Sequence, residues 1–289
     1  MTTTIYNSTE FEAKLMAIYD SRLKQWPIPY NSIFLDTSYG KVHVIISGPK
    51  DAPPVLLLHA AGMSASSWLY NIEGLNLHYR TYAIDNIGEV GKSALNDLDS
   101  FPNDGKALND LYTEISDKLE VGNAYVIGAS NGGFIATNYA LYSPERVKKL
   151  VLLGPMGVTP ATDSTIQKIE QSALPDTQLS PEDMLRWALG DNPRVLEAYG
   201  EWFGLVMGGT RPRVAAPIPF APEQLQTISC PVLLILGEKD NLVGDPTKVK
   251  ELAQNIPDIQ IEILNSGHLI SADQPYIVNN LIYEFFEQR

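Results

Sequence analysis

The segment that most constrains the fold spans residues 126–134 and has the sequence VIGASNGGF. The apolar run of residues 124–127 leads into it and a helix-like run follows it, so Ser130 is expected on a tight turn between a strand and a helix. A Cβ atom at Gly128 or Gly132 would crowd the backbone of such a turn. The pattern G-x-S-x-G is typical of a serine nucleophile, but a glycine-rich turn without chemistry has the same pattern, so other parts of the chain must decide.

Short apolar runs and runs with helical periodicity alternate along most of the chain. The predicted strands are residues 33–36, 42–47, 55–58, 81–84, 124–127, 147–153, 231–236 and 259–264. The predicted helices are residues 9–25, 64–75, 105–119, 131–143, 246–255 and 274–287. The first two strands form a hairpin, and the later alternation predicts a mostly parallel sheet covered by helices on both faces. Ligands bind such sheets beyond the carboxyl ends of the strands.

The alternation stops between residues 157 and 227. No buried strand is predicted there, and Pro and Gly residues separate helical pieces rich in aromatic side chains. We interpret residues 157–227 as a helical cap inserted into a core domain made of residues 1–156 and 228–289. A long surface excursion is the alternative, but excursions of this length are uncommon unless they cover something.

A serine hydroxyl needs a base to become a nucleophile, and the chain has four histidines. His268 follows the last predicted strand, so its ring would lie over the carboxyl ends of the strands, near Ser130. His43 lies within the hairpin and His78 at a polar helix end. His59 ends a strand, where a structural hydrogen-bonding role is equally consistent with its position. His268 is therefore the candidate base.

The base in turn needs a carboxylate that fixes its tautomer. In the order serine, acid, histidine, the acid follows the buried strand 231–236, and Asp240 stands in a turn of the form G-x-x-D. Glu238 and Asp245 are the neighbouring alternatives, and each has the simpler interpretation of a solvated loop charge.

The tetrahedral intermediate of acyl transfer needs two oriented N–H donors. The backbone N–H of Asn131, directly after the serine, is the first candidate. The second is Ala61, in the small-residue loop after the strand 55–58, with Ala60 as an alternative donor. A plain turn between a strand and a helix also favours Ala and Gly, so this loop has a structural interpretation as well.

Charge and composition exclude several classes of partner. The formal net charge of −13 disfavours nucleic acid and anionic membranes, both of which call for a basic face. It also favours neutral over anionic substrates. The N-terminal segment is polar and has no apolar core of a signal peptide, and the single cysteine, Cys230, allows no internal disulfide. We expect a cytoplasmic monomer or homodimer that acts on a small molecule.

Five motifs together resemble the α/β-hydrolase superfamily: GASNGG around Ser130, LLILGEKD at Asp240, NSGH at His268, the HAAG loop and DNIGEVGKS. The stretches GKVHVIISGPKDAPPVLLLHAAGMSASSW, YRTYAIDNIGEVGKS and SPERVK are similar to bacterial carboxylesterases of the naproxen-esterase type. The resemblance implies an α/β-hydrolase fold whose eight-stranded, mostly parallel sheet is flanked by helices, with the cap between strands six and seven. It also implies a serine hydrolase without a cofactor or metal.

The chain departs from the superfamily at two places. Many members have His-Gly where this chain has His59-Ala60, and the added methyl group would narrow the oxyanion loop. Apolar Met or Leu is common where Asn131 stands. The backbone N–H of Asn131 is unaffected, while its amide would either polarise the pocket or serve packing and hydrogen bonding.

These observations predict a hydrolase that cleaves a carboxylic ester of a small to medium uncharged substrate through an acyl-enzyme. The residues expected to line its substrate pocket are His59, Met63, Met156, Trp187, Trp202, Phe203, Met207, Leu242 and Leu269. The cap aromatics among them could equally form the cap's own core. Asp85 is expected to brace the loops rather than to catalyse.

Two alternatives stay open. A C–C bond hydrolase would use the same triad and hold a substrate carboxylate with a cation of the cap. The candidate cations are Arg186, Arg194, Arg211 and Arg213, each of which has the simpler interpretation of a solvated surface arginine. The other alternative is a non-catalytic ligand-binding homologue, which an intact Ser-Asp-His set disfavours.

Overall fold

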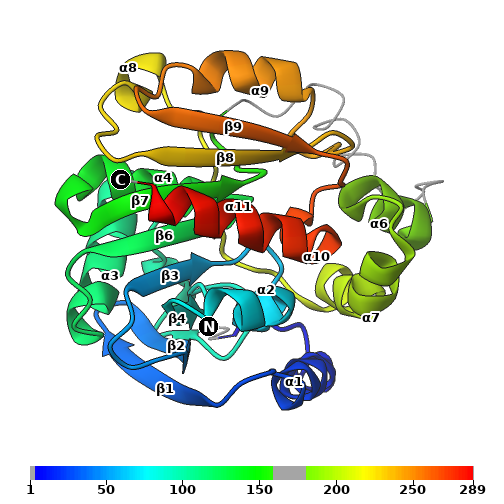
Figure 1. The fold of residues 1–289 in the computed structure, drawn as a ribbon. Coiled ribbons are helices and arrows are strands. Elements are labelled where there is room, and N and C mark those ends of the chain that lie inside the picture. The colour runs from blue at the N-terminus through cyan, green and yellow to red at the C-terminus, as the bar shows by residue number, and fades with distance from the viewer. Residues whose placement is uncertain (1–3, 159–179, 289) are drawn as a thin grey trace.

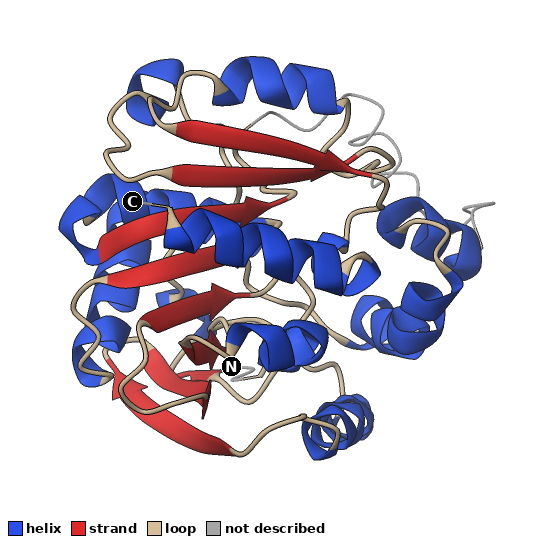
Figure 2. Cartoon of the chain, in the orientation of Figure 1, coloured by secondary structure: helices blue, strands red, loops and turns tan. Residues whose placement is uncertain are grey.

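A computed structural model describes residues 4–158 and 180–288, and it is built on one twisted sheet (Figures 1 and 2). The strands are β1 (Tyr30–Thr37), β2 (Gly40–Ser47), β3 (Pro54–Leu58), β4 (Arg80–Ile84), β5 (Ala94–Leu95), β6 (Ala124–Ala129), β7 (Val147–Leu153), β8 (Val232–Gly237) and β9 (Ile259–Leu264). Their order is β1-β2-β4-β3-β6-β7-β8-β9, with β5 paired to β2. The pairs β1–β2, β2–β4 and β2–β5 are antiparallel, and all others are parallel.

The predicted eight-stranded, mostly parallel sheet is confirmed, and β5 is an addition to it. β5 was not predicted because it contains only Ala94 and Leu95, too few residues for a periodic pattern. The prediction also began β6 correctly but ended it early, at Ile127, because Gly128 and Ala129 continue the pairing with β7.

Helices cover both faces of the sheet, and two of them, α6 and α7, lie beyond its edge. The helices are α1 (Thr9–Lys24), α2 (Leu69–Leu75), α3 (Gly105–Lys118), α4 (Asn131–Tyr142), α6 (Pro181–Leu189), α7 (Pro193–Gly209), α8 (Pro222–Leu225), α9 (Pro246–Ala253), α10 (Ile270–Asp273) and α11 (Pro275–Glu287). Side-chain caps start several of them; Ser8 accepts the N–H of Phe11 in α1, and Asp104 accepts that of Ala107 in α3. The helices predicted from periodicity outside residues 157–227 are all present, with ends shifted by a few residues.

The alternation of side chains along β3 separates two apolar cores. Val55 and Leu57 pack with the core that contains α2 and α11, which lie in front of the sheet in Figure 1. Leu56 and Leu58 point the other way, into the core that contains α3 and α4. Because β3 is buried on both faces, its residues form a continuous apolar run, as expected for a central parallel strand.

Between β7 and β8, the described residues of 157–227 contain α6, α7 and α8 and no strand named in the sheet. Helices α6 and α7 lie together at one end of the molecule in Figure 1. Helix α1 packs against α7, where the buried Arg22 guanidinium lies 4.5 Å from the Tyr199 ring centroid and 4.9 Å from that of Trp202. The division into a core domain and a cap at 157–227 stays a prediction, and its residues 159–179 lie outside the described residues.

The turn between β6 and α4 has the strained geometry that the sequence predicts. Ser130 has φ 51° and ψ −116°, a backbone conformation that residues other than glycine rarely adopt. A Cβ atom on Gly128 would overlap the carbonyl of Gly132, and one on Gly132 would overlap that of Leu58. The expectation that both positions need glycine is therefore confirmed.

We predict that Gly132→Ala lowers the free energy of unfolding by about 3 kcal/mol, because the new methyl group forces the turn away from β3. The matched control is Gly122→Ala, whose Cβ would meet no atom within 4 Å and should change stability by less than about 0.5 kcal/mol. Urea unfolding followed by circular dichroism measures both variants. Equal stability of Gly132→Ala and the unchanged protein would contradict the close approach of α4 to β3.

Candidate active site

Three side chains from distant parts of the chain meet at the carboxyl ends of the strands. Ser130 follows β6, Asp240 follows β8 and His268 follows β9. The Nε2 atom of His268 lies 2.8 Å from Ser130 Oγ, and its Nδ1 atom lies 2.7 Å from Asp240 Oδ2. All three side chains are buried. The structure therefore brings together the predicted serine, acid and histidine in one hydrogen-bonded chain.

The contacts of Asp240 define the roles in this chain. Its Oδ1 accepts the backbone N–H groups of Leu242 at 2.9 Å and Val243 at 3.1 Å, so the carboxyl acts as an acceptor on both oxygens. With Asp240 accepting, Nδ1 of His268 carries the ring proton and Nε2 has a free lone pair. The Ser130 hydroxyl can then donate to Nε2, which is the geometry needed to remove its proton.

The alternatives for the acid and the base lie elsewhere. Glu238 is exposed, and Asp245 caps α9 by accepting the N–H of Thr247 at 2.9 Å. His78 is exposed, and its ring centroid lies 4.6 Å from that of Tyr283 in a tilted contact. None of these side chains contacts His268 or Ser130.

His59 is buried, and its hydrogen bonds determine its tautomer. Its Nε2 accepts the backbone N–H of Asn86 at 2.9 Å, so Nδ1 carries the proton and donates to the carbonyl of Ala60 at 2.8 Å. Burial lowers the pKa of His59, which keeps the ring neutral. Since the C=O and N–H of a trans peptide point in opposite directions, this bond turns the N–H of Ala61 away from the His59 ring.

Near Ser130, the backbone N–H of Ala60 has no acceptor among the residues that the structure describes, and the same holds for the N–H groups of Ala61 and Asn131. All three residues line the cavity that contains Ser130. The neighbouring N–H of Gly62 is already used, because it donates to Glu89 Oε2 at 2.8 Å. The arrangement is compatible with Ala61 and Asn131 as oxyanion donors, a role that stays a prediction, as does the alternative of Ala60.

The amide of Asn131 has an unusual environment. Asn131 is 2% exposed, and within the described chain neither Nδ2 nor Oδ1 has a hydrogen-bond partner. An unsatisfied buried polar group costs about 1–3 kcal/mol, so a hydrophobic residue would be more stable here. Internal hydrogen bonding was one expected role of this amide, but the described residues offer it no partner.

The cavity beside Ser130 has a volume of about 290 Å³ and a mostly apolar wall. Its wall is formed by Ala60, Ala61, Met63, Ser130, Asn131, Met156, Leu189, Phe203, Val214, Pro217, Leu242, His268 and Leu269. The expected pocket residues Met63, Met156, Phe203, Leu242 and Leu269 are among them. Leu189, Val214 and Pro217 were missed, because they lie at the end of α6 and in the segment after α7, where no periodic pattern marks them.

Four expected pocket residues do not line this cavity, which corrects the expectation for them. His59 is buried below the loop by the bonds described above. Trp202 is 1% exposed in the apolar core, with its Nε1 donating to the carbonyl of Gly62 at 2.7 Å. Met207 is 60% exposed on the outer side of α7, and Trp187 packs against the core that includes α7.

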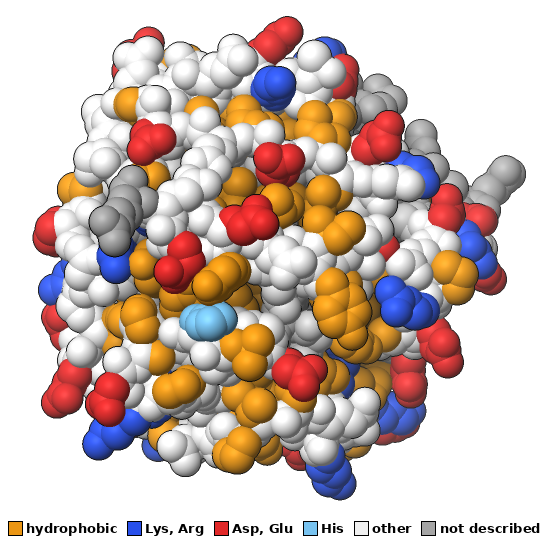
Figure 3. Space-filling view, in the orientation of Figure 1, with side chains coloured by type: hydrophobic (Ala, Val, Ile, Leu, Met, Phe, Trp, Pro, Cys, Tyr) orange, Lys and Arg blue, Asp and Glu red, His pale blue; other side chains and the backbone are white. Residues whose placement is uncertain are grey.

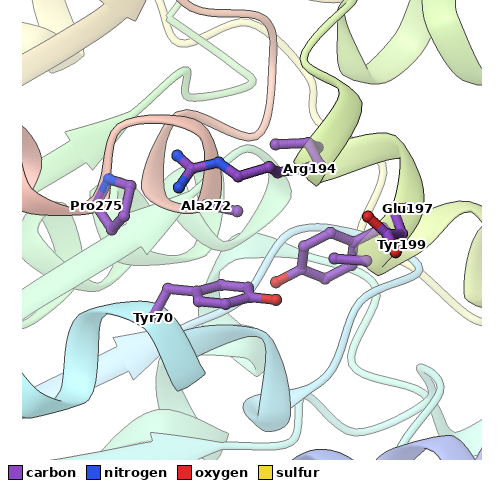
Figure 4. Close-up of a pocket in the computed structure, with 8 residues that line it drawn as sticks. Tyr70, Arg194, Glu197, Tyr199, Ala272 and Pro275 are labelled. Carbon is purple, nitrogen blue, oxygen red and sulfur yellow. The ribbon is translucent and has the colours of Figure 1, made fainter.

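The candidate cations of residues 157–227 also lie away from the cavity. Arg186 pairs with Glu182 at 2.9 Å on the surface of α6, and Arg211 and Arg213 are exposed. Arg194 lines a separate hollow of about 350 Å³ between α2, α7 and α10 (Figure 4). Within the described residues, the wall of the Ser130 cavity therefore contains no lysine or arginine.

Asp85 braces the loops at this edge of the sheet. It is fully buried, and its carboxyl oxygens accept from Ala65 N at 2.7 Å, Lys92 N at 3.0 Å and Tyr19 Oη at 2.9 Å. His43 Nδ1 lies 2.8 Å from the same carboxyl. Burial raises the pKa of Asp85, but the hydrogen bond and charge of His43 and the other contacts outweigh it and lower the pKa below its ordinary value.

Residues 4–158 and 180–288 have neither a metal-binding cluster nor a membrane-spanning helix. These residues contain no group of three or more His, Cys, Asp or Glu side chains placed to hold a metal ion. Among their helices, none has both the length and the apolar character needed to cross a bilayer. On the face shown in Figure 3, the described Lys and Arg side chains are scattered among acidic ones and form no continuous basic patch.

We predict that Asp85→Asn lowers the free energy of unfolding by about 3 kcal/mol, because an amide N–H₂ would face groups that donate to the carboxylate. The pKa of Asp85 is lower in the folded than in the unfolded chain. The stability that the ionised carboxyl contributes is therefore present at neutral pH and is lost as the pH falls through the folded-state pKa. Urea unfolding at pH 7 and pH 3 measures it. The control is Asp36→Asn, with an 86% exposed side chain, where we expect less than about 0.5 kcal/mol. A loss no larger than that of the control would contradict the bracing role.

Known proteins resemble this chain over nearly its whole length. The profile of the alpha/beta hydrolase fold family matches residues 53–200. The uncharacterized carboxylesterase nap of Bacillus subtilis (strain 168) is 31% identical over 276 residues, which cover 93% of this chain and 90% of that protein. Carboxylesterase YbfK of the same organism is 30% identical over 295 residues, covering 97% and 98%. The crystal structure of naproxen esterase (carboxylesterase NP) from Bacillus subtilis has a TM-score of 0.86 and 31% identity, covering 97% of this chain and 100% of that chain.

Proposed function

Because the chain belongs to the α/β-hydrolase fold family, we propose that it is a serine carboxylesterase whose catalytic triad is Ser130, His268 and Asp240. The observation that carries the proposal is the continuous hydrogen-bonded chain from Ser130 Oγ through the His268 ring to Asp240, at 2.8 and 2.7 Å. The order and spacing of these groups are those of a nucleophile, a general base and the carboxylate that orients the base. The relatives named carboxylesterase, at about 30% identity, support the same reaction class.

In the proposed reaction, His268 Nε2 takes the proton of Ser130 as Oγ attacks the ester carbonyl carbon. The tetrahedral intermediate then collapses, and the imidazolium of His268 protonates the departing alkoxide. Asp240 stabilises the imidazolium through Nδ1. Water, activated by the same ring, attacks the acyl-enzyme and releases the acid and free Ser130.

We assign the oxyanion site to the backbone N–H groups of Ala61 and Asn131. Both are free of acceptors in the described structure, and both border the cavity. Such donors stabilise the negative charge that develops on the carbonyl oxygen, and removing one typically costs about 10²–10³ in kcat. The bond from His59 to the Ala60 carbonyl supports this orientation for Ala61.

The cavity suggests a small to medium uncharged ester. Its volume of about 290 Å³ and its side chains of Met, Leu, Val, Phe and Pro suit an apolar acyl or alcohol group. The formal net charge of −13 disfavours anionic substrates. We propose that residues 157–227 form a cap and that Phe203, Val214 and Pro217 of this segment contact the substrate.

The alternative of C–C bond hydrolysis has weaker support. It needs a cation that holds a substrate carboxylate, and the described wall of the cavity has none. The alternative of a non-catalytic binding protein also has weaker support, because ligand binding alone does not require a serine hydroxyl aligned on a histidine lone pair.

We predict that Ser130→Ala and His268→Ala reduce kcat for p-nitrophenyl butyrate by about 10³-fold or more, and Asp240→Asn by about 10²–10⁴-fold. The matched control is Asp245→Asn, because its side chain only caps α9 and asparagine caps equally well. Labelling of Ser130 by a fluorophosphonate probe measures the nucleophile independently. Loss of activity in Asp245→Asn with retention in Asp240→Asn would show that the acid is assigned wrongly.

We further predict selectivity within a panel of p-nitrophenyl acetate, butyrate and succinate and a vinylogous diketone acid. The neutral acetate and butyrate esters should be hydrolysed with kcat/KM at least about tenfold above the anionic succinate half-ester, because no cation is available in the described cavity wall. Turnover of the diketone acid above that of the esters would favour C–C hydrolysis instead.

A further inference from the structure

Glu89 is a buried carboxyl next to the candidate oxyanion loop, and the reaction steps above do not use it. It lies in the segment 85–93 after β4 and is 2% exposed. Its Oε2 accepts the backbone N–H of Gly62 at 2.8 Å, one residue after the proposed donor Ala61. Its Oε1 lies 3.4 Å from Nδ2 of Asn86, which also donates to the carbonyl of His59 at 3.1 Å.

The loop from Ala60 to Met63 is held at each of its peptide groups. His59 donates to the carbonyl of Ala60, and the N–H of Met63 donates to that carbonyl at 3.0 Å. Glu89 holds the N–H of Gly62, and Trp202 of α7 donates to the carbonyl of Gly62 at 2.7 Å. Gly62 has φ +71°, so the loop turns sharply at this residue.

The peptide groups on the two sides of Ala61 thus have separate anchors. His59 fixes the plane of the Ala60–Ala61 peptide, and Glu89 fixes that of the Ala61–Gly62 peptide. Because peptide groups are planar, these two anchors together determine the φ and ψ angles of Ala61 and hence the direction of its N–H. Without Glu89, only the first plane would be fixed.

Resting on the proposed function, we propose that Glu89 is a positioning residue of the ester hydrolysis: it orients Ala61 through Gly62, and it does so as a neutral carboxylic acid. A neutral acid keeps a carbonyl oxygen that accepts the N–H of Gly62. It places no negative charge beside the oxyanion that forms in the reaction, whereas a carboxylate there would repel it.

The surroundings of Glu89 favour the neutral form. Burial raises its pKa to about 8, although the hydrogen bonds from Gly62 and Asn86 act in the opposite direction, and the charge of Asp85 raises it further. Tyr112 of α3, whose pKa burial raises, also faces Glu89. His59, which burial keeps neutral, is joined to Glu89 through Asn86. Glu89 also borders a hollow whose wall includes Tyr6, Glu12, Asp20 and Lys92, and there Lys92 Nζ pairs with Asp20 at 2.6 Å.

Three variants and their pH profiles test the proposal. Glu89→Gln keeps an acceptor oxygen and cannot ionise, so kcat for p-nitrophenyl butyrate at pH 7 should stay within about threefold of the unchanged protein. Glu89→Ala loses the anchor, so kcat should fall about tenfold to a hundredfold, with KM changed less than about threefold. Glu73→Gln, an exposed glutamate on α2, is the matched control and should behave like the unchanged protein.

The pH dependence separates positioning from a general structural role. In the unchanged protein and in Glu73→Gln, kcat should decline between pH 7 and pH 9.5 as Glu89 ionises, and in Glu89→Gln this decline should be absent. The same alkaline decline in Glu89→Gln as in the unchanged protein, or full kcat in Glu89→Ala at pH 7, would overturn the proposal.

Thermal unfolding tests the ionisation of Glu89 without any substrate. Its folded-state pKa of about 8 lies above the ordinary value of 4.5, so the folded protein binds more protons than the unfolded chain between these pH values. Its contribution to stability therefore falls as pH rises through this range. The Tm of Glu89→Gln relative to the unchanged protein should rise from pH 5 to pH 9, and an unchanged difference would overturn the neutral-acid assignment. Absence of ester hydrolysis by the unchanged protein would instead count against the proposed function, while this Tm difference would still report on Glu89.

Discussion

The site depends on a contact in which the backbone of α4 approaches β3 with no side chain between them. Gly132, in the first turn of α4, lies directly against the carbonyl groups of Leu58 and His59, and a single methyl group would not fit. This contact ties the turn that carries Ser130 to the start of the loop that carries Ala61. Since the proposed nucleophile and a proposed oxyanion donor follow different strands, their separation is determined by this backbone approach rather than by flexible side chains.

The second requirement is that the loops at this sheet edge hold their shape although little regular structure supports them. Buried polar side chains provide that support from below. Asp85 holds the first residue of η1, a short 3₁₀ helix (Ala65–Trp68), and His59 and Glu89 hold the loop from Ala60 to Met63 that precedes it. Asn86 connects His59 and Glu89, because its backbone N–H donates to Nε2 of His59 and its side-chain amide donates to Glu89. Asp85, Asn86 and Glu89 belong to one segment after β4, so a single excursion of the chain organises both loops. Fully hydrogen-bonded buried networks of this kind favour one conformation.

Local signals were enough to predict most of the fold and the meeting of Ser130, Asp240 and His268 at one edge of the sheet. Each central strand is short and apolar, and the letters around Ser130, Asp240 and His268 place each of them directly after a strand, so the geometry of a parallel sheet brings them together. The pocket wall was predicted only in part. Trp202 was expected there because aromatic residues of a cap commonly line pockets. Instead, its indole N–H donates to the carbonyl of Gly62 and its ring is buried in the core. Which side of a helix faces a cavity depends on how that helix docks, and residues 157–227 have no strand pattern that would fix the docking.

Glu89 shows a different limit of sequence reasoning. In the sequence it is one acid within DNIGEVGKS, and nothing in its neighbours distinguishes it from an exposed loop glutamate. Its environment arises only when the segment after β4 folds beneath the Ala60–Met63 loop and removes it from water. Burial of an acid without a cation raises its pKa, and the cost of that burial is acceptable only if the position contributes something else. We infer from the hydrogen bond to Gly62 that this contribution is the orientation of Ala61. Burying Glu89 then costs stability, and in exchange it orients a proposed oxyanion donor.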